Sequence, residues 1–115
     1  MAAQKIEKPE WRAFVDTLSK GLVGKRAEIE VASLALGDQI EADWLPLLGI
    51  TYDPKDDLLE VVLDGLDHMI RKPREMYADS GNGGLLSFEI IDADGVSQII
   101  RLSEPLMLVP PTATG

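Results

Sequence analysis

The segment GLDHMIRKPREMY contains the residues of this chain that are best suited to chemistry. It holds the only histidine, His68, followed closely by three cations, Arg71, Lys72 and Arg74. A histidine oriented by a carboxylate such as Asp67 can act as a general acid or base. A lone histidine more often has a structural role, in which it hydrogen-bonds a backbone carbonyl or caps a turn. The sequence favours the structural role for His68.

The three cations predict a basic corner with two possible uses. Guanidinium groups form paired hydrogen bonds with carboxylates and phosphates, so Arg71, Lys72 and Arg74 are candidate ligands for a phosphate, a nucleotide or an acidic protein surface. The alternative is internal compensation by neighbouring carboxylates, in exposed ion pairs that each contribute roughly 0–1 kcal/mol. We favour compensation and keep these three residues, with His68, as a tentative binding site.

Aspartates gather in two segments, DPKDD at 53–57 and DADG at 92–95. Carboxylates at such spacing can bind Ca²⁺, but neither segment has the later ligands and bidentate glutamate of a calcium-binding loop. Aspartate is also favoured in turns, because its side chain hydrogen-bonds the local backbone. We therefore predict two hairpin turns and no metal site.

Several reaction classes require patterns that the chain lacks. GNGG at 81–84 has no lysine and no following helix pattern for a phosphate loop, and no G-x-S-x-G occurs for a serine nucleophile. One histidine and no cysteine leave only oxygen donors to complete a transition-metal site. A small hydrolase that uses His68 with aspartates is the remaining enzymatic hypothesis. We predict no cofactor and favour a protein without enzymatic activity.

The charge balance limits the classes of partner. The 115 residues include 20 acidic and 11 basic ones, for a net charge of −9, which repels nucleic acid. No apolar run approaches the roughly 20 residues that cross a bilayer, and the N-terminus lacks the apolar region of a secretory signal. With no cysteine in the chain, this pattern predicts a cytoplasmic protein with neither a nucleic-acid nor a membrane partner.

An amphipathic helix is predicted at the N-terminal end. Trp11, Phe14, Val15 and Leu18 have the spacing i, i+3, i+4 and i+7 of one helical face. Pro9 suits the first helical position. Residues 1–8 are expected to be disordered, residues 9–109 to form a single α+β domain, and residues 110–115 to form a tail.

Beyond residue 25 the hydrophobic period changes to two, which predicts five to seven short antiparallel strands. Strands are expected near 26–32, 44–52 and 58–63 and in a hairpin over 85–102, whereas GDQIEAD at 37–43 is expected to be a polar loop. Residues 66–72 fit either a helical turn or a strand. The helix then packs on either a strongly twisted open sheet or a small barrel.

Two tryptophans are candidate anchors for a recognition surface. Trp11 belongs to the apolar face of the predicted helix and is expected in the core. Trp44 begins a strand beside Pro46, a residue typical of an edge strand or a strand start. Trp44 is therefore the better candidate for binding.

The order of several short motifs resembles a bacterial family of small uncharacterised proteins, catalogued as a domain of unknown function. The motifs are W-R-A-F, L-P-L-L-G-I-T-Y-D, L-D-H-M-I-R-K-P, I-I-D-A-D-G and I-I-R-L. Their most distinctive part is the spacing of His68, Ile70 and Pro73, and the resemblance runs from about Trp11 to Leu108. It implies a single intact domain, and no activity or catalytic residue comes with it.

We therefore predict a non-enzymatic protein-interaction or regulatory module. Its partner is another protein, or a second copy of the chain that docks through an edge strand or the helix. A small-anion or nucleotide-binding regulator that uses Arg71, Lys72 and Arg74 is the alternative, and the enzyme that uses His68 comes third.

Overall fold

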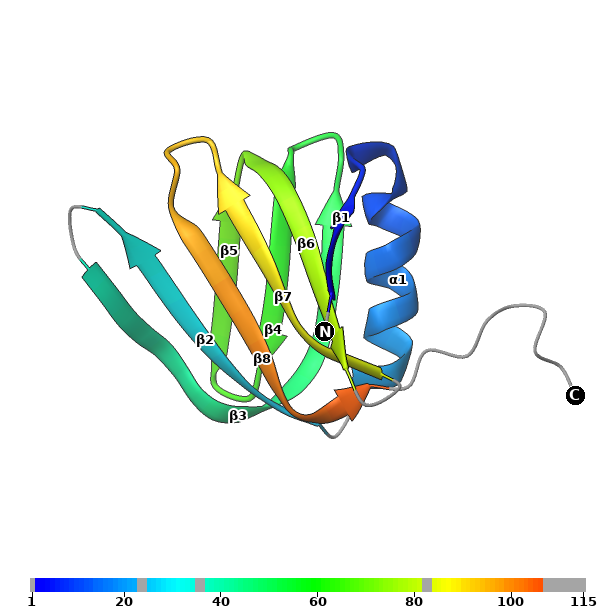
Figure 1. Ribbon diagram of the computed structural model, residues 1–115, viewed down its shortest axis with the longest axis vertical. Coiled ribbons are helices and arrows are strands. Elements are labelled where there is room, and N and C mark those ends of the chain that lie inside the picture. The colour runs from blue at the N-terminus through cyan, green and yellow to red at the C-terminus, as the bar shows by residue number, and fades with distance from the viewer. Residues whose placement is uncertain (1, 23–24, 35–36, 82–83, 107–115) are drawn as a thin grey trace, which may run out of the picture.

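One antiparallel sheet and one α-helix make up the described part of the chain (Figure 1). The structure is a computed structural model that describes residues 2–22, 25–34, 37–81 and 84–106. Its elements are β1 (Ala2–Ile6), the 3-10 turn η1 (Lys8–Glu10), α1 (Trp11–Leu22), β2 (Arg26–Ser33), β3 (Gly37–Asp53), β4 (Leu58–Leu63), β5 (Leu66–Arg71), β6 (Pro73–Gly81), β7 (Gly84–Asp92) and β8 (Ser97–Leu106). The strands are hydrogen-bonded in the order β1-β6-β7-β8-β2-β3-β4-β5.

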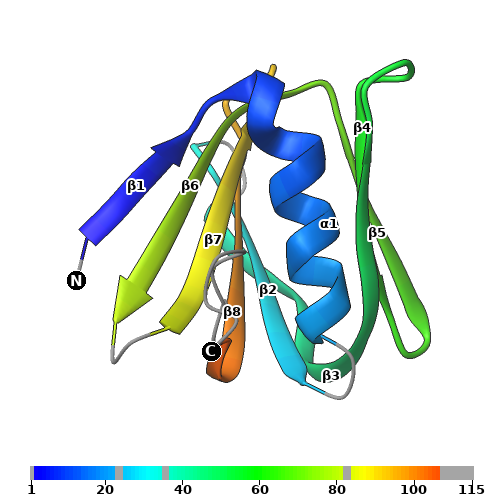
Figure 2. The ribbon, with the colours of Figure 1, turned by 90° about the vertical axis from the view of Figure 1, so that its right-hand side faces the viewer.

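A bend in β3 folds this sheet into two leaves. The first part of β3 pairs with β2 as far as Pro46, and from Leu47 onward β3 pairs with β4. Trp44 lies at the bend with a φ of 55°. The front leaf is β1, β6, β7, β8, β2 and the first part of β3, and the back leaf is the rest of β3 with β4 and β5 (Figures 1 and 2).

The helix α1 lies between the two leaves, with β1 on one side and β3 and β4 on the other (Figure 2). Trp11, Val15 and Leu18 are fully buried and Phe14 is partly buried, which confirms the predicted apolar face. Ser19 Oγ accepts a 3.2 Å hydrogen bond from the backbone N–H of Ile50 on β3. This contact fixes the helix against the back leaf.

The core between the leaves is largely aliphatic, as the low aromatic content requires. Every strand from β2 to β8 contributes side chains that are almost fully buried, because alternate residues of a strand point to the same face. The largest of these strand side chains are Ile29, Leu47, Ile50, Leu59, Leu63, Ile70, Met76, Phe88 and Ile90.

The sheet is not closed, so the barrel alternative is wrong. Its end strands are β1 and β5, and the eight strands of the described part exceed the five to seven expected. One added strand is β1, where a disordered terminus was expected. Residues 2–6 pair with β6, Ile6 packs on the core, and Trp11 Nε1 donates a 2.7 Å hydrogen bond to the carbonyl oxygen of Ile6.

Residues 37–43 are also strand, not the expected polar loop. They form the first part of β3 and pair with β2 from Ser33↔Gly37 to Ile29↔Ala42. Residues 37–41 are all exposed. A segment solvated on both faces shows no alternation of apolar and polar residues, so its sequence resembles a loop.

Residues 66–71 form a strand, β5, which settles the choice left open by the sequence. The side chains of Asp67, Met69 and Arg71 are exposed, whereas Ile70 is buried and His68 is half-buried.

The predicted hairpins β3–β4 and β7–β8 are both present. Gly95 lies in the turn of the second hairpin with a φ of 79°. Pro46 lies inside the sheet, not at its edge, and its carbonyl oxygen accepts a 2.9 Å hydrogen bond from the N–H of Asp64. The predicted tail at 110–115 lies outside the described residues.

Candidate functional site

Outward-facing side chains form polar rows across the front leaf. The pairing of β6, β7, β8 and β2 places Tyr77, Glu89, Ile99 and Glu30 in one row, and Asp79, Ser87, Arg101 and Glu28 in the next. Residues between them, such as Ala78, Phe88 and Ile100, are buried on the core side. The alternation of each strand therefore creates a continuous outer face that is rich in carboxylates.

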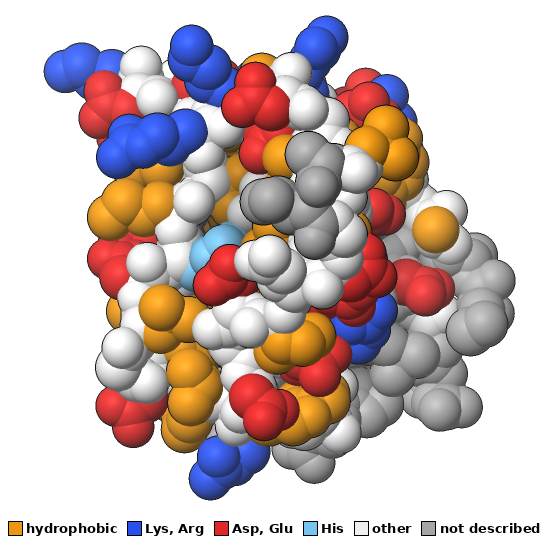
Figure 3. Space-filling model, turned by 90° about the vertical axis from the view of Figure 1, so that its left-hand side faces the viewer, with side chains coloured by type: hydrophobic (Ala, Val, Ile, Leu, Met, Phe, Trp, Pro, Cys, Tyr) orange, Lys and Arg blue, Asp and Glu red, His pale blue; other side chains and the backbone are white. Residues whose placement is uncertain are grey.

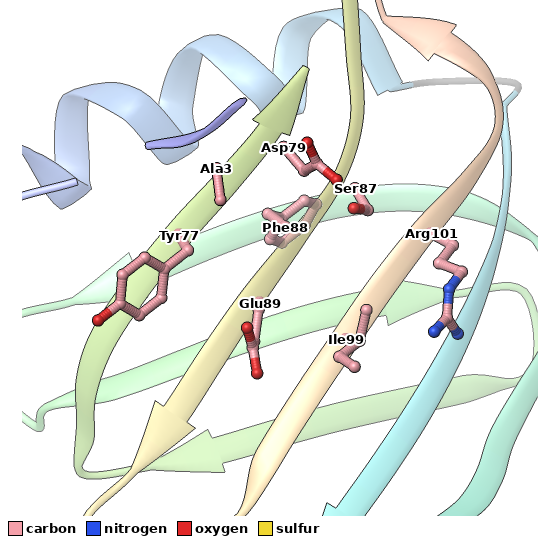
Figure 4. Close-up of a pocket in the computed structure, with 8 residues that line it drawn as sticks. All are labelled: Ala3, Tyr77, Asp79, Ser87, Phe88, Glu89, Ile99 and Arg101. Atoms are coloured by element: carbon pink, nitrogen blue, oxygen red, sulfur yellow. The ribbon is translucent and has the colours of Figure 1, made fainter. Parts of the chain in front are cut away.

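A pocket of about 270 Å³ lies on this outer face (Figure 4). Its lining comes from β1, β6, β7 and β8: Ala3, Tyr77, Asp79, Ser87, Phe88, Glu89, Ile99 and Arg101. The apolar residues of the lining are Ala3, Phe88 and Ile99, of which Phe88 has its side chain buried on the core side. The polar part combines two carboxylates, two hydroxyls and one guanidinium group.

The guanidinium group of Arg101 is engaged by carboxylates at the edge of the pocket. Its Nη1 donates hydrogen bonds of 3.0 Å to Glu28 Oε1 and 2.6 Å to Glu30 Oε1. Two hydrogen bonds lower the pKa of Glu30: the larger effect comes from the bond with Arg101, and the smaller one from the bond with Asp38. The hydrogen bond with Glu30 in turn raises the pKa of Asp38. Arg101 is therefore shared among several acidic groups.

Two hydroxyl groups on this face are also bound internally. The Tyr77 hydroxyl donates to Glu75 Oε1, and this bond, together with burial and the charge of Glu75, raises the pKa of Tyr77. Ser97 Oγ donates to Glu89 Oε2. Within the described part of the chain, Asp79 and Ser87 have neither a side-chain hydrogen bond nor an ion pair. Asp79 and Ser87 are thus the polar groups of the pocket that are available to a ligand.

His68 connects the two leaves. Its Nε2 lies 2.7 Å from Oε1 of Gln98 on β8, and because an amide oxygen only accepts hydrogen bonds, Nε2 carries the proton. Gln98 is 5% exposed, and its Nε2 donates a 3.2 Å hydrogen bond to Asp92 Oδ2. The histidine side chain, in pale blue, is visible on the side of the molecule opposite α1 (Figure 3). These contacts support a structural role, in which His68 satisfies a buried amide.

Within the basic corner, the backbone of Lys72 connects two turns by hydrogen bonds. Lys72 has a φ of 53°; its N–H donates to the carbonyl oxygen of Asp57, and its own carbonyl oxygen accepts from the N–H of Ala93, both at 2.9 Å. Burial by itself would raise the pKa of Asp57. Hydrogen bonds from Tyr52 and Lys8 and the nearby charge of Lys72 outweigh this effect, so the pKa of Asp57 is lowered. The ion pair of Asp57 is formed with Lys8, at 3.1 Å, and the charge of Lys72 is a smaller influence on the same carboxylate.

Arg71 and Arg74 are exposed, at the end of β5 and the start of β6. Arg71 Nη2 lies 4.0 Å from Met69 Sδ. In the described ranges, no hydrogen bond or ion pair joins Arg71, Lys72 and Arg74 to one another. The structure thus places the three cations near one end without assembling them around a shared point.

Trp44 lies on β3, which β2 separates from the pocket strand β8. It is 37% exposed at the bend of β3, where its carbonyl oxygen accepts a 3.1 Å hydrogen bond from Arg26 Nη1. Other large apolar side chains with substantial exposure are Leu34, Ile40, Leu48 and Met69. Trp44 does not line the pocket.

Sequence reasoning missed Tyr77, Asp79, Ser87, Glu89 and Arg101. Each lies at a polar position of an alternating strand, so its outward direction was predictable. They lie on three strands that are consecutive both in the chain and in the sheet, β6, β7 and β8, and the register of the two pairings brings them together. The periodicity of each strand was the available signal, and it does not report this register.

In the described ranges, no group of three or more His, Cys, Asp or Glu side chains could hold a metal ion. Among the helices described, none is long and apolar enough to span a membrane.

Comparison with known proteins shows the family of this chain. The model of a family of unknown function (DUF5335) matches residues 2–111. An uncharacterised protein of Aquifex aeolicus (strain VF5) is 37% identical over 109 residues, which cover 94% of this chain and 98% of that protein. No solved structure matches the chain significantly. The chain therefore belongs to the family of unknown function DUF5335.

Proposed function

We propose that this protein is a non-enzymatic, cytoplasmic binding module that recognises a lysine- or arginine-bearing segment of a partner protein on the outer face of β6, β7 and β8. The observation that carries the proposal is the pocket on this face. Asp79 and Ser87 line it without a side-chain partner in the described part of the chain, next to Glu89 and the apolar Ile99.

Charge supports a cationic ligand. The outward carboxylates on and around the pocket belong to Glu28, Glu30, Asp38, Glu75, Asp79 and Glu89, and the whole chain has a net charge of −9. Arg101 is already bound to two of these carboxylates. A surface of this sign attracts basic partners and repels acidic ones.

The size and lining of the pocket fit one long basic side chain. Its volume of about 270 Å³ is just below the roughly 300–1,000 Å³ typical of small-molecule sites. The aliphatic stem of a lysine or arginine can cover Ile99, while its charged head donates hydrogen bonds to Asp79 and Glu89. Ser87 adds a hydroxyl acceptor beside them.

The position of His68 supports binding over hydrolysis. The imidazole bonds Gln98, which points to the core side of β8, whereas Ile99 and Arg101 line the pocket on the other side of the same strand. The front leaf thus separates the one histidine of the chain from the pocket carboxylates. A general acid-base pair needs both groups within hydrogen-bond reach of one substrate.

Peptide titration followed by backbone amide shifts tests the proposal. Tetra-lysine and tetra-arginine peptides should shift the amides of 77–79, 87–89 and 99–101, while a tetra-glutamate peptide should not. Asp79→Asn should weaken binding at least about tenfold, because a hydrogen bond to a charged group contributes roughly 1.5–3 kcal/mol.

Asp56→Asn is the matched control, since it removes the same charge from an exposed turn residue. It should leave the affinity within about twofold of the parent. Unmoved pocket amides at millimolar basic peptide, or equal affinities of Asp79→Asn and Asp56→Asn, would refute the proposal.

A further inference from the structure

Within the described part of the chain, the strand β5 ends the sheet with a row of unpaired backbone groups. In an antiparallel pair, residues alternate between bonded positions and positions whose N–H and C=O point away from the neighbour. The 2.9 Å bond from Lys72 N to Asp57 O marks 57↔72 as a bonded pair. The register of β4 and β5 then leaves Asp67, Met69 and Arg71 with backbone groups directed away from β4.

The side chains of these three residues are self-complementary. Asp67, Met69 and Arg71 share one face of β5, and all are exposed, with Met69 at 46%. Asp67 lies two positions before Met69, and Arg71 lies two positions after it. When an identical strand runs antiparallel about Met69, each acid therefore faces a base.

We propose that two copies of this chain pair through their β5 strands, antiparallel and about a twofold axis at Met69. In this register, Met69 opposes the partner's Met69, and Asp67 opposes the partner's Arg71. The N–H and C=O groups that point away from β4 bond those of the second copy. The two back leaves then form one continuous sheet.

A pair of carboxyl groups beside this edge supports a cationic partner. Glu60 on β4 lies opposite Met69, and the hydrogen bond with Asp67, followed by burial and the charge of Asp67, raises the pKa of Glu60. Among the described residues, no cation is a source of this shift. The partner's Arg71 would face Asp67 and offset the charge that these two acids share.

The other end strand, β1, is less suited to self-pairing. Its exposed side chains include one charge, Lys5, and no acid to oppose it. Natural edge strands are often protected by lysine or proline within the strand, and β5 has neither between Leu66 and Arg71. The edge of β5 is therefore the more open and the more complementary of the two.

Sedimentation equilibrium of the full-length chain between about 1 µM and 1 mM tests this pairing. The parent should show a concentration-dependent rise from 12.6 kDa towards twice that mass. Arg71→Glu should raise the dimer dissociation constant at least about tenfold, because like charges then oppose each other at both ends of the pair. The exchange of both residues, Asp67→Arg with Arg71→Asp, should restore it.

Two further variants separate the edge from general effects. Arg74→Glu makes the same charge change at an exposed residue outside β5 and should leave the dissociation constant unchanged. Met69→Pro removes an N–H that points away from β4, so it should abolish the dimer while the melting temperature of the monomer falls little.

A parent that stays monomeric at 1 mM would overturn the inference. So would equal effects of Arg71→Glu and Arg74→Glu, or a charge exchange that fails to restore the dimer. The pocket on the front leaf contains none of these residues, so failure of self-pairing and failure of peptide binding are distinguishable.

Discussion

The Tyr52 hydroxyl donates a 2.8 Å hydrogen bond to Asp57 Oδ1, the same oxygen that lies 3.1 Å from Lys8 Nζ. The ring of Tyr52 meets Trp11 edge-on, with centroids 5.4 Å apart, and Lys8 Nζ lies 5.2 Å from the centroid of Trp11. These contacts connect β3, the β3–β4 turn, η1 and the start of α1. They hold the N-terminal segment against the back leaf.

Tyr52 should make the stability of the protein depend on alkaline pH. Burial, followed by the hydrogen bond to Asp57, raises the pKa of Tyr52 from 10.0 to about 12. Its contribution is complete below pH 10 and is lost as the pH rises towards 12, because the unfolded phenol ionises first. Between pH 9 and pH 11, the free energy of unfolding should fall by about 1 kcal/mol more in the parent than in Tyr52→Phe. Urea unfolding followed by circular dichroism measures this, and identical pH dependences would contradict it.

Loss of the imidazole should destabilise the fold. His68→Ala removes the hydrogen bond to the Gln98 side chain, which is 5% exposed. An unsatisfied buried polar group costs about 1–3 kcal/mol, so the free energy of unfolding in urea should fall by that amount. Arg74→Ala, at an exposed residue, is the control and should change it by less than about 0.5 kcal/mol. An unchanged midpoint for His68→Ala would contradict the structural role.

The backbone of Lys72 should favour glycine. Its φ of 53° is strained for residues with a Cβ atom, so Lys72→Gly should be more stable than Lys72→Ala by about 1 kcal/mol. Both variants remove the same cation, so their difference isolates the backbone. At Arg71, which lies inside β5, the alanine variant should be more stable than the glycine variant. Thermal unfolding of the four variants checks this, and equal stabilities at position 72 would argue against the left-handed conformation.

Residues 2–6 should behave as a strand. Deletion of residues 1–5 removes the pairing of β1 with β6, so we expect the free energy of unfolding to fall by roughly 1–3 kcal/mol. Hydrogen exchange of the full-length chain should show protected amides within residues 2–6. Exchange at random-coil rates throughout this segment would contradict the strand.

The candidate site illustrates the limit of prediction from one sequence. The basic corner was visible because its three cations are adjacent in the chain, and the structure uses one of them, Lys72, to connect turns. The pocket was invisible because Asp79, Ser87 and Arg101 come from three strands. Their alignment in one row depends on hydrogen-bonded register, which periodicity does not encode.

The sequence by itself determined the local features of this protein. The spacing of Trp11, Phe14, Val15 and Leu18 dictates an amphipathic helix, and alternation dictates the strands that have one wet face. Glycine and aspartate dictate the tight turns, such as the one at Gly95. Each of these features depends on neighbours within a few residues, where propensity and periodicity act.

Only the tertiary structure decided how these parts assemble. The strand character of residues 2–6 and the open sheet with ends at β1 and β5 depend on partners far away in the chain. Residues 37–43 pair with β2, directly before them, but have no apolar face that would mark them as a strand. Strand pairing is made by backbone groups that every residue carries. Its partners are therefore chosen by packing of the whole chain rather than by any local pattern.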